Sequence, residues 1–262
     1  MAINVDTVYK TVLLILNKEQ RGYITPNEFN RTATQVQLDI FEQYFDDLNQ
    51  QLRVPQSDYD YSDRQMSVDE NISIFKTEGA CIYANGKFNL PIADTDGNVV
   101  VNDGTEPTGT QVVFYKLGTP VYQTVTGDVT EIERLQRNDF YNIQKSPLTA
   151  STKDFPTYLY ESNKLIIRPT SITTSINTSF IRKPRNVAWG YNVGTLGQYI
   201  YVSPASATPN NGIASQHFEL NASEQVNVIT RILFYSGVII RDPQVIQVAA
   251  SEIQQTEINK KS

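Results

Sequence analysis

The sequence predicts an α+β fold in which helices from both termini pack in one layer and an antiparallel β domain, a sandwich or a barrel, is inserted between them. Two patterns support this. Apolar residues recur at helical spacing up to about Leu52 and again from His217 to Ser262, whereas short strand-like runs separated by turns fill the stretch from Ile72 to Tyr201. The predicted parts are a helical domain (residues 1–54 with 217–262), a loop or arm (55–71) and a β-rich domain (72–216).

Two helices are predicted in the N-terminal segment. The first covers about residues 5–19, and its apolar stripe comprises Val5, Val8, Tyr9, Val12, Leu13 and Leu16. The second has a clear start signal, because Thr25 is an N-cap candidate, Pro26 takes the first helical position and Glu28 completes a capping box. This helix continues with a broad apolar face to about Leu52.

The stretch from Pro55 to Glu70 shows neither a helical nor a strand period. It is rich in Asp and Tyr, so we predict a loop or arm of the kind that becomes ordered on a neighbouring subunit. Beyond it the period becomes that of strands. We predict strands within 72–78, 86–91, 111–117, 120–125, 157–169 (two strands around a turn at 162–163), 175–184 and 198–202, a hairpin within 93–104, and a short helical insertion over 129–140.

Two further helices are predicted at the C-terminus. Asn221 is an N-cap candidate with Glu224 as its capping-box partner, and Gly237 bends or ends the helix that follows. Asp242 and Pro243 form a second start signal. The last helix has Val245, Ile246, Ala249 and Ile253 on one face.

Composition and charge restrict the function. Charged residues make up 19% of the chain, and the net charge is −6 with a pI of about 4.9. Because phosphate neutralisation by basic side chains drives tight binding to nucleic acid, such binding is disfavoured, although an acidic wall past which DNA slides is allowed. With the single cysteine Cys81 an intrachain disulfide is impossible, and the N-terminus lacks the basic start of a signal peptide, so we expect folding in a cytoplasm.

No residue is predicted to be catalytic or to bind a cofactor or metal. His217 is the only histidine, so a catalytic triad or a histidine-rich metal site is disfavoured, and a structural position just before a helix is expected. Cys81 lies in an apolar, strand-like context without a CxxC partner. A buried small hydrophobic residue is therefore favoured over a nucleophile.

Two acidic stretches also favour structural interpretations. Asp94, Asp96 and Gly97 suggest a calcium loop, but the glycine comes too early and no Glu follows at the required place, so a hairpin tip is preferred. A second acidic run has Tyr59 and Tyr61 interleaved. A solvated arm or subunit contact is preferred there over a glycosidase pair, which needs rigid placement across a cleft. Its acidic members are Asp58, Asp60, Asp63, Asp69 and Glu70.

The densest basic cluster is Arg182-Lys183-Pro184-Arg185. A contact with phosphate or with an acidic neighbour is one interpretation, and a charged strand edge that blocks aberrant pairing is an equal alternative. No glycine-rich phosphate loop occurs. The cluster alone therefore does not indicate a nucleotide site.

A series of stretches samples the whole chain in a fixed order. They are Val8-Tyr9, Asn17–Asn30, Ala33, Gln37 and Asp39–Glu42, then Phe180–Pro184 and Trp189–Tyr191, and finally Phe218–Leu220, Ser223-Glu224 and Gly237–Pro243. In this order they resemble virion structural proteins of short-tailed bacteriophages, the crAss-like and related marine phages. The specificity of the resemblance lies in the order of the stretches and not in any single motif.

The resemblance implies a head-to-tail connector protein, an adaptor or tail-ring subunit that forms a dodecameric ring below the portal and around the DNA ejection channel. It implies no cofactor. The implied partners are copies of the chain itself, the portal protein and other tail or ring proteins, with DNA passing through the lumen without specific binding and no membrane. The implied location is the virion, after assembly in the host cytoplasm.

Two alternatives come from other functional classes. A β-sandwich receptor- or glycan-binding module of a tail appendage would present exposed coplanar aromatic rings in a groove. An enzyme such as a cell-wall hydrolase would hold a Glu/Asp pair across a cleft. We expect no enzyme, because histidine, cysteine and phosphate loops are so scarce.

Overall fold

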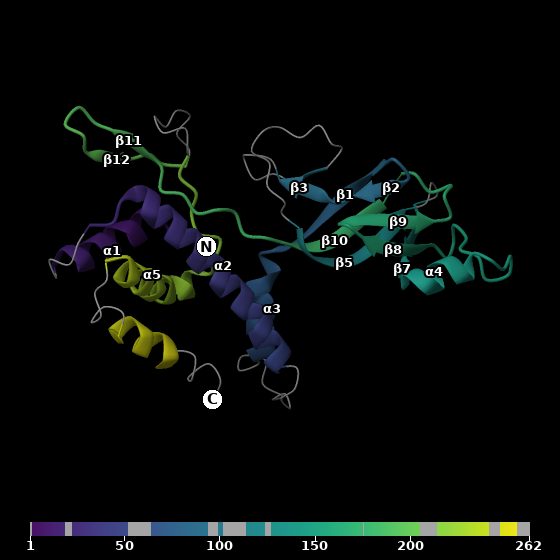
Figure 1. Cartoon of the computed structure of the whole chain (residues 1–262), viewed down its shortest axis with the longest axis horizontal. Coiled ribbons are helices and arrows are strands. Elements are labelled where there is room, and N and C mark those ends of the chain that lie inside the picture. The colour runs from purple at the N-terminus through teal and green to yellow at the C-terminus, as the bar shows by residue number, and fades with distance from the viewer. Residues whose placement is uncertain are drawn as a thin grey trace. The chain divides into compact units, whose positions relative to one another are not determined.

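The computed structural model describes residues 2–18, 23–51, 64–93, 99–101, 114–123, 127–174, 176–204, 214–240 and 247–255 (Figure 1). The chain divides into two compact units. The helical unit comprises Met1–Ile74 with Pro184–Ser262, and the β unit comprises Phe75–Lys183. This confirms the predicted α+β fold with a β domain inserted between terminal helices.

The helical unit is built on three helices that contact one another. Helix α5 packs against both α1 and α2, so helices from the two termini share one layer as predicted. Side chains that are completely buried in this unit include Val8, Val12, Phe29, Val36, Val228 and Ile232. The elements of the unit are α1 (Val5–Lys18), α2 (Pro26–Gln51), α3 (Arg64–Ser73), β11 (Tyr191–Val193), β12 (Tyr199–Tyr201), the 3-10 helix η2 (Ala222–Glu224), α5 (Gln225–Ile240) and a helical segment over 247–255.

The predicted capping box at the start of α2 is confirmed. The backbone N–H of Thr25 donates to Oε2 of Glu28 at 2.9 Å, and the N–H of Glu28 donates to Oγ1 of Thr25 at 3.4 Å. The hydroxyl of Thr25 donates to the same Oε2 at 2.7 Å, and this hydrogen bond, together with the one from the Thr25 N–H, lowers the pKa of the Glu28 carboxyl. The box satisfies backbone donors that the first helical turn leaves without partners.

Other predictions about the helical unit need correction. The predicted loop or arm over 55–71 is partly helical, because α3 begins at Arg64; residues 52–63 lie outside the described part of the chain. Val68 and Ile72, four positions apart, are the buried side of α3, which packs on α2. The helix after Asn221 does not end at Gly237 but continues to Ile240. Asp242 and Pro243 lie outside the described residues.

The β unit is a sheet that nearly closes into a barrel. Its strand order is β6-β5-β10-β1-β2-β9-β8-β7, so β6 and β7 are the two edges. These edges are separated in sequence by Ile132 alone, whose N–H donates to the carbonyl of Pro120 in β5, while the N–H of Leu135 donates to Tyr158 in β8. One short segment therefore joins both edges of the sheet, and the unpaired edges that an open sheet exposes are largely removed.

Residues on the inner face of this sheet form an apolar core. Its buried members are Cys81, Phe88, Leu90, Ile132, Tyr158, Leu165, Ile167, Ile172 and Ile176. The strands and helix of the unit are β1 (Lys76–Ala84), β2 (Lys87–Asn89), β3 (Pro91–Ala93), β4 (Val99–Val101), β5 (Phe114–Gln123), β6 (Val129–Glu131), β7 (Glu133–Arg134), α4 (Arg137–Ile143), β8 (Thr157–Glu161), β9 (Lys164–Arg168) and β10 (Ile176–Arg182).

Several strand predictions are confirmed, including the short strands within 86–91 and 198–202 and the antiparallel pairing of β3 with β4 that a hairpin within 93–104 requires. The strand predicted from Ile72 begins too early, because α3 continues to Ser73 and β1 begins at Lys76.

The turn at Ser162 and Asn163 joins β8 to β9, and both residues have positive φ, as a two-residue hairpin turn requires. The helical insertion predicted over 129–140 is wrong in its first half, because 129–134 forms β6 and β7 and only α4 is helical. The two strands predicted over 111–125 are one strand, β5, with a bulge.

The bulge in β5 depends on Gly118. Gly118 and Thr119 together lie opposite Ser179 of β10, whose hydroxyl accepts from the N–H of Thr119 at 2.9 Å and donates to its carbonyl at 3.2 Å. A Cβ added at Gly118 would lie 2.8 Å from the backbone oxygen of Ser179. The absence of a side chain at this position is therefore required by close approach of the two strands.

Gly118→Ala should lower the free energy of unfolding of the β unit by roughly 1–3 kcal/mol, because the added methyl group must displace backbone. Thr119→Ala is the matched control: Thr119 is exposed and takes part in the bulge through its backbone, so the change should stay within about 0.5 kcal/mol. Urea denaturation followed by circular dichroism measures both. Equal stability of the two variants would contradict this account of the bulge.

Thr25→Ala should lower the free energy of unfolding of the helical unit by about 1 kcal/mol at neutral pH. Since the folded-state pKa of Glu28 is depressed, the stabilisation from its carboxylate is present above the unfolded pKa of about 4.3 and is lost as the pH falls through the folded value. The difference between variant and wild type should therefore shrink below about pH 4. Urea denaturation at neutral and acidic pH measures it, and a pH-independent difference would argue against a role for the carboxylate.

Candidate interaction surface

The residues singled out in the sequence have structural partners and do not converge on one site. Nδ1 of His217 accepts a hydrogen bond from the N–H of Val5 at 3.4 Å, next to the β-bridge between Ile3 and Phe218. Cys81 is buried in the core of the β unit, and this burial raises the pKa of its thiol to about 12. The histidine thus helps to join the chain termini, and the thiol is protonated at neutral pH.

The acidic stretches do not form a described metal site. Within the described ranges, no group of three or more His, Cys, Asp or Glu side chains is arranged to hold a metal ion. Asp69 and Glu70 are exposed on α3. The remaining residues of those predictions lie outside the described part of the chain: Asp58, Tyr59, Asp60, Tyr61, Asp63, Asp94, Asp96 and Gly97.

The arginines of the basic cluster have separate partners. The guanidinium of Arg182 lies 5.6 Å from the ring centroid of Phe75, a cation–π contact within the β unit. Arg185 belongs to the helical unit, where its backbone N–H donates to Oε2 of Glu219 at 2.9 Å and its Nε donates to Oε1 at 2.8 Å. The acidic neighbour anticipated for this cluster is therefore Glu219 of the same chain.

Arg185 begins an extended segment, 185–189, that is held along α2 by three polar side chains. Asn30 accepts from the N–H of Trp189 at 2.7 Å and donates to its carbonyl at 3.4 Å. Oγ1 of Thr34 accepts from the N–H of Val187 at 3.1 Å and donates to its carbonyl at 3.3 Å. The α2 side chains thus serve the extended segment in the way that a neighbouring strand would.

The third side chain, Gln37, links this segment to a second one. Its Nε2 donates to the carbonyl of Arg185 at 2.7 Å, and its Oε1 accepts from the N–H of Glu219 at 2.9 Å. Gln37 is completely buried, so leaving either group unpaired would be costly. We call Asn30, Thr34 and Gln37 the α2 ladder and residues 185–189 the strap.

The spacing of the three ladder side chains along α2 lets them reach every second residue of the strap. Steps of four and three residues along a helix advance about 6.0 and 4.5 Å, whereas two residues of extended chain advance about 6.6 Å. The difference is about 2.7 Å over the two steps, and the longer side chains at the two ends, Asn30 and Gln37, can span it. The opposite edge of the strap is satisfied as well, since Ala188 and Gln216 exchange backbone hydrogen bonds of 3.2 and 2.7 Å.

The strap ends at Trp189, which it fixes against α1. The Trp189 ring packs on Tyr9 with a centroid distance of 4.5 Å, and its Nε1 donates to Oδ1 of Asp6 at 3.1 Å. Tyr9 in turn packs on Phe29 of α2 at 4.8 Å. Burial is the largest cause of a strongly raised pKa of the Tyr9 hydroxyl, so the ring is a neutral part of this core.

A two-stranded hairpin, β11 with β12, rises from Trp189. The ring of Trp189 lies 5.9 Å from that of Tyr191 and 5.8 Å from that of Tyr201, and Tyr191 meets Tyr199 edge-on at 4.8 Å. At the base, Val202 donates to the carbonyl of Gly190 at 2.9 Å. One face of the hairpin is therefore a column of aromatic rings that continues into the core of the helical unit.

The tip of this hairpin is tightly closed and exposes apolar side chains. The N–H of Gly194 donates to Gln198 and the N–H of Gly197 donates to Gly194, while Gly197 has a φ of +79°, which favours glycine. The backbone N–H of Leu196 is held by the side chain of Gln198 at 3.1 Å. Leu196 is 91% exposed, and Val193, Tyr199 and Ile200 are also exposed.

A sequence signal for this surface was present and was missed. From Asn186 to Gln216 the chain contains no Asp, Glu, Lys or Arg, although such residues make up 19% of the whole. A solvated hairpin has no need to be free of charge, whereas a surface that becomes buried does. An ordered, uncharged hairpin tip with several apolar side chains is thus the best candidate for an interaction surface in the described residues.

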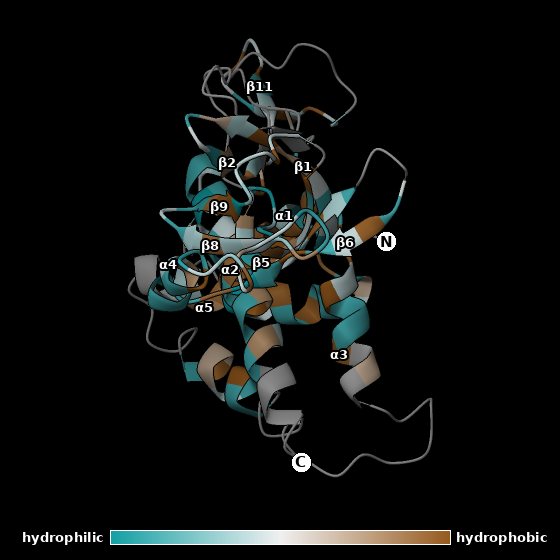
Figure 2. Cartoon of the chain, turned by 90° about the vertical axis from the view of Figure 1, so that its right-hand side faces the viewer, coloured by the Kyte–Doolittle hydropathy of each residue, from teal (hydrophilic) through white to brown (hydrophobic). Residues whose placement is uncertain are grey.

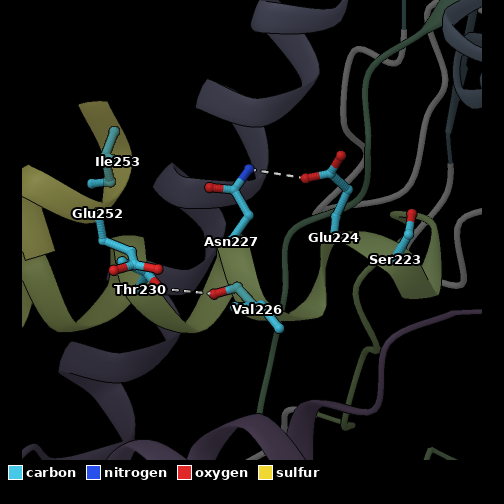
Figure 3. Close-up of a pocket in the computed structure, with 7 residues that line it drawn as sticks. All are labelled: Ser223, Glu224, Val226, Asn227, Thr230, Glu252 and Ile253. Atoms are coloured by element: carbon cyan, nitrogen blue, oxygen red, sulfur yellow. Dashed lines mark hydrogen bonds between the residues drawn. The ribbon is translucent and has the colours of Figure 1, made fainter. Parts of the chain in front are cut away.

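Two shallow hollows lie elsewhere. One, of about 180 Å³, lies between α5 and the helix over 247–255 (Figure 3). The other, of about 470 Å³, lies on β1, β5 and β10 beside the bulge, and is lined by Lys76, Thr77, Glu78, Lys116, Leu117, Gly118, Ser179, Phe180 and Ile181. Both are mixed polar and apolar, and neither contains the residues singled out from the sequence as candidate catalysts.

Thr34→Val should lower the free energy of unfolding of the helical unit by about 1–3 kcal/mol, because it leaves two groups of Val187 unpaired at nearly constant volume. The double variant Asn30→Ala/Thr34→Val should lose less free energy of unfolding than the sum of the losses of the two single variants, because either change alone releases the same strap. Gln35→Ala, which removes an exposed contact with Asp39 on the same helix, should stay within about 0.5 kcal/mol. Urea denaturation measures the free energy of unfolding of each variant. If the losses of the two single variants are strictly additive in the double variant, Asn30 and Thr34 do not hold the strap jointly.

Comparisons with known proteins provide no family assignment. No protein-family model matches the chain, and no curated protein is significantly similar to it. Across the described ranges, the model contains no helix that is long and apolar enough to cross a membrane. The function is therefore argued from the geometry of the chain itself and from the resemblance noted above.

Proposed function

We propose that this chain is a non-enzymatic structural subunit of a bacteriophage head-to-tail connector or tail ring, an adaptor that assembles into a closed ring around the DNA ejection channel. The observation that carries the proposal is the rigid, uncharged hairpin tip on the helical unit, with Leu196 at its end. The resemblance to virion proteins of short-tailed phages supplies the biological setting, in which the portal and other tail or ring proteins are the neighbours.

The hairpin has the properties of a protein-binding element. Its loop is held by backbone and side-chain hydrogen bonds, so little conformational entropy is lost when it binds. Its base is anchored to Trp189 and through it to Tyr9 and Phe29. An apolar anchor residue on a rigid support is the arrangement from which interface hot spots are made.

The charge of the chain agrees with both parts of the proposal. At a net charge of −6, copies repel one another at long range, and an uncharged tip allows close approach without bringing like charges together. The same acidic balance disfavours tight phosphate binding. A conduit subunit benefits from this, because DNA must pass through the ring without being retained.

The second candidate is a receptor- or glycan-binding module of a tail appendage. The observation in its favour is the hollow on β1, β5 and β10, which places polar side chains such as Glu78 and Ser179 beside Leu117 and Phe180. Carbohydrate sites also use exposed, coplanar rings. In the hairpin only Trp189 and Tyr191 stack, face to face on each other, while Tyr201 is tilted against Trp189 and Tyr199 meets Tyr191 edge-on. The rings therefore do not present a shared flat surface to a sugar, and the hairpin itself favours a protein partner.

Leu196→Asp should abolish or strongly weaken self-assembly without changing the melting temperature. Burying a carboxylate in an apolar contact costs several kcal/mol. The protein concentration at which half of the chains are assembled should therefore rise at least about tenfold. Leu148→Asp is the matched control, since Leu148 is 94% exposed against 91% for Leu196. Sedimentation velocity and mass photometry measure the assemblies. The proposal fails if the wild-type chain stays monomeric over the whole concentration range, or if both variants assemble equally well.

A further inference from the structure

We infer that the hairpin tip of one copy inserts into the groove between α5 and the helix over 247–255 of a second copy, so that neighbouring subunits join head to tail. This rests on the proposed ring-forming function and specifies its contact. The groove is the hollow of about 180 Å³ in the helical unit (Figure 3). It is lined by Ser223, Glu224, Val226, Asn227, Thr230, Glu252 and Ile253.

The groove presents polar and apolar groups in about equal measure, and two of its inner polar groups already have partners. Oε2 of Glu224 accepts from Nδ2 of Asn227 at 2.9 Å, and the hydroxyl of Thr230 donates to the carbonyl of Val226 at 3.0 Å (Figure 3). Val226 is 70% exposed, and Ile253 on the helix over 247–255 is the other apolar residue of the lining. These two side chains supply the aliphatic part of the lining, against which an incoming aliphatic group can pack.

The size of the groove suits a single aliphatic anchor. About 180 Å³ is several times the ~30 Å³ that one water molecule occupies, so the hollow has room for a branched aliphatic side chain. In the described ranges of the helical unit, Leu196 is the aliphatic side chain with the greatest exposure. It is also the one carried on a narrow, closed turn, which can reach into a hollow between two helices.

The two surfaces lie on different sides of the helical unit. The hairpin lies on one side of α1 and α2 and α5 lies on the other in both views (Figures 1 and 2), and Figure 1 shows the helix over 247–255 on the side of α5. When the tip of one copy occupies the groove of another, the pair still has one unoccupied groove and one unoccupied tip. Such heterologous contacts repeat from copy to copy and close into a ring when the rotation between copies permits.

Charge also favours an uncharged occupant. Glu224 and Glu252 lie at the groove, on a chain that is acidic overall, so an acidic segment would be repelled. The stretch from Asn186 to Gln216 contains no charged side chain. The hairpin within it can enter without introducing like charge or burying an unpaired one.

Mixed cysteine variants test the contact directly. Leu196→Cys and Ile253→Cys are prepared separately, with tags of different size, mixed, and oxidised under mild conditions. Cys81 is only 6% exposed and does not compete. A disulfide between the two variants is expected, since contacting residues can reach the 4.4–6.8 Å Cα separation that such a bond needs. Leu148→Cys mixed with Ile253→Cys is the control and should not cross-link.

Charge substitution supplies a second readout that does not depend on disulfide geometry. Val226→Asp should require at least about tenfold more protein for half-assembly, because it adds a third carboxylate to the groove. Val248→Asp is the matched control: Val248 is 68% exposed against 70% for Val226, it precedes Glu252 by one helical turn, and it is not among the residues that line the groove. It should assemble like wild type.

The outcomes separate this inference from the proposed function. If rings form but no mixed disulfide appears and Val226→Asp assembles like wild type, the groove is not the acceptor, and the ring proposal stands with another occupant. If Leu196→Cys links only to itself, the contact is symmetric and the head-to-tail inference is wrong. If neither assembly nor cross-linking occurs, both the inference and the proposed function fail.

Discussion

The helical unit depends on the pairing between α2 and the strap. A strap of extended chain that crosses a helix would normally leave the backbone groups on its helix-facing edge without partners. Asn30, Thr34 and Gln37 supply these partners on one edge, and Gln216 supplies them on the other. The strap thus has hydrogen-bond partners on both edges, as an inner strand of a sheet has, although only one backbone segment lies beside it.

This pairing links the core to the exposed surface. Because the strap is fixed at Arg185 and Val187, Trp189 has a defined position on Tyr9 and Asp6. The hairpin that follows Trp189 inherits that position through stacked rings. An apolar tip on a flexible loop would lose much of its binding energy in becoming ordered; on this support the tip is ordered beforehand, which is what a subunit that must repeat the same contact around a ring requires.

Features with local signals could be predicted from the sequence, and features that depend on tertiary partners could not. The start of α2 was predictable because Thr25, Pro26 and Glu28 are adjacent in the chain and bond to one another. Helix α3 was missed because its buried side, Val68 and Ile72, is too short to define a period. The strap and its ladder could not be predicted, since their partners lie between 148 and 159 positions apart and each ladder residue alone looks like an ordinary polar helix position.

The β-strand at 198–202 was predicted, but its place in the helical unit was not, because that place is set by Trp189. The uncharged stretch that contains the hairpin was visible, and only its shape explains why charge is absent.

Native-state hydrogen exchange at the backbone amides of Val187 and Trp189 tests the central claim most directly. Both amides donate to side chains of α2, not to a neighbouring strand. If the ladder holds the strap as described, they should exchange as slowly as amides in the middle of α2, and Thr34→Val should accelerate exchange at Val187 more than at sites within the helix. Exchange of both amides as fast as the amide of Thr195, an exposed residue of the hairpin turn, would show that the strap is not held by α2, and the account of how the hairpin is positioned would be wrong.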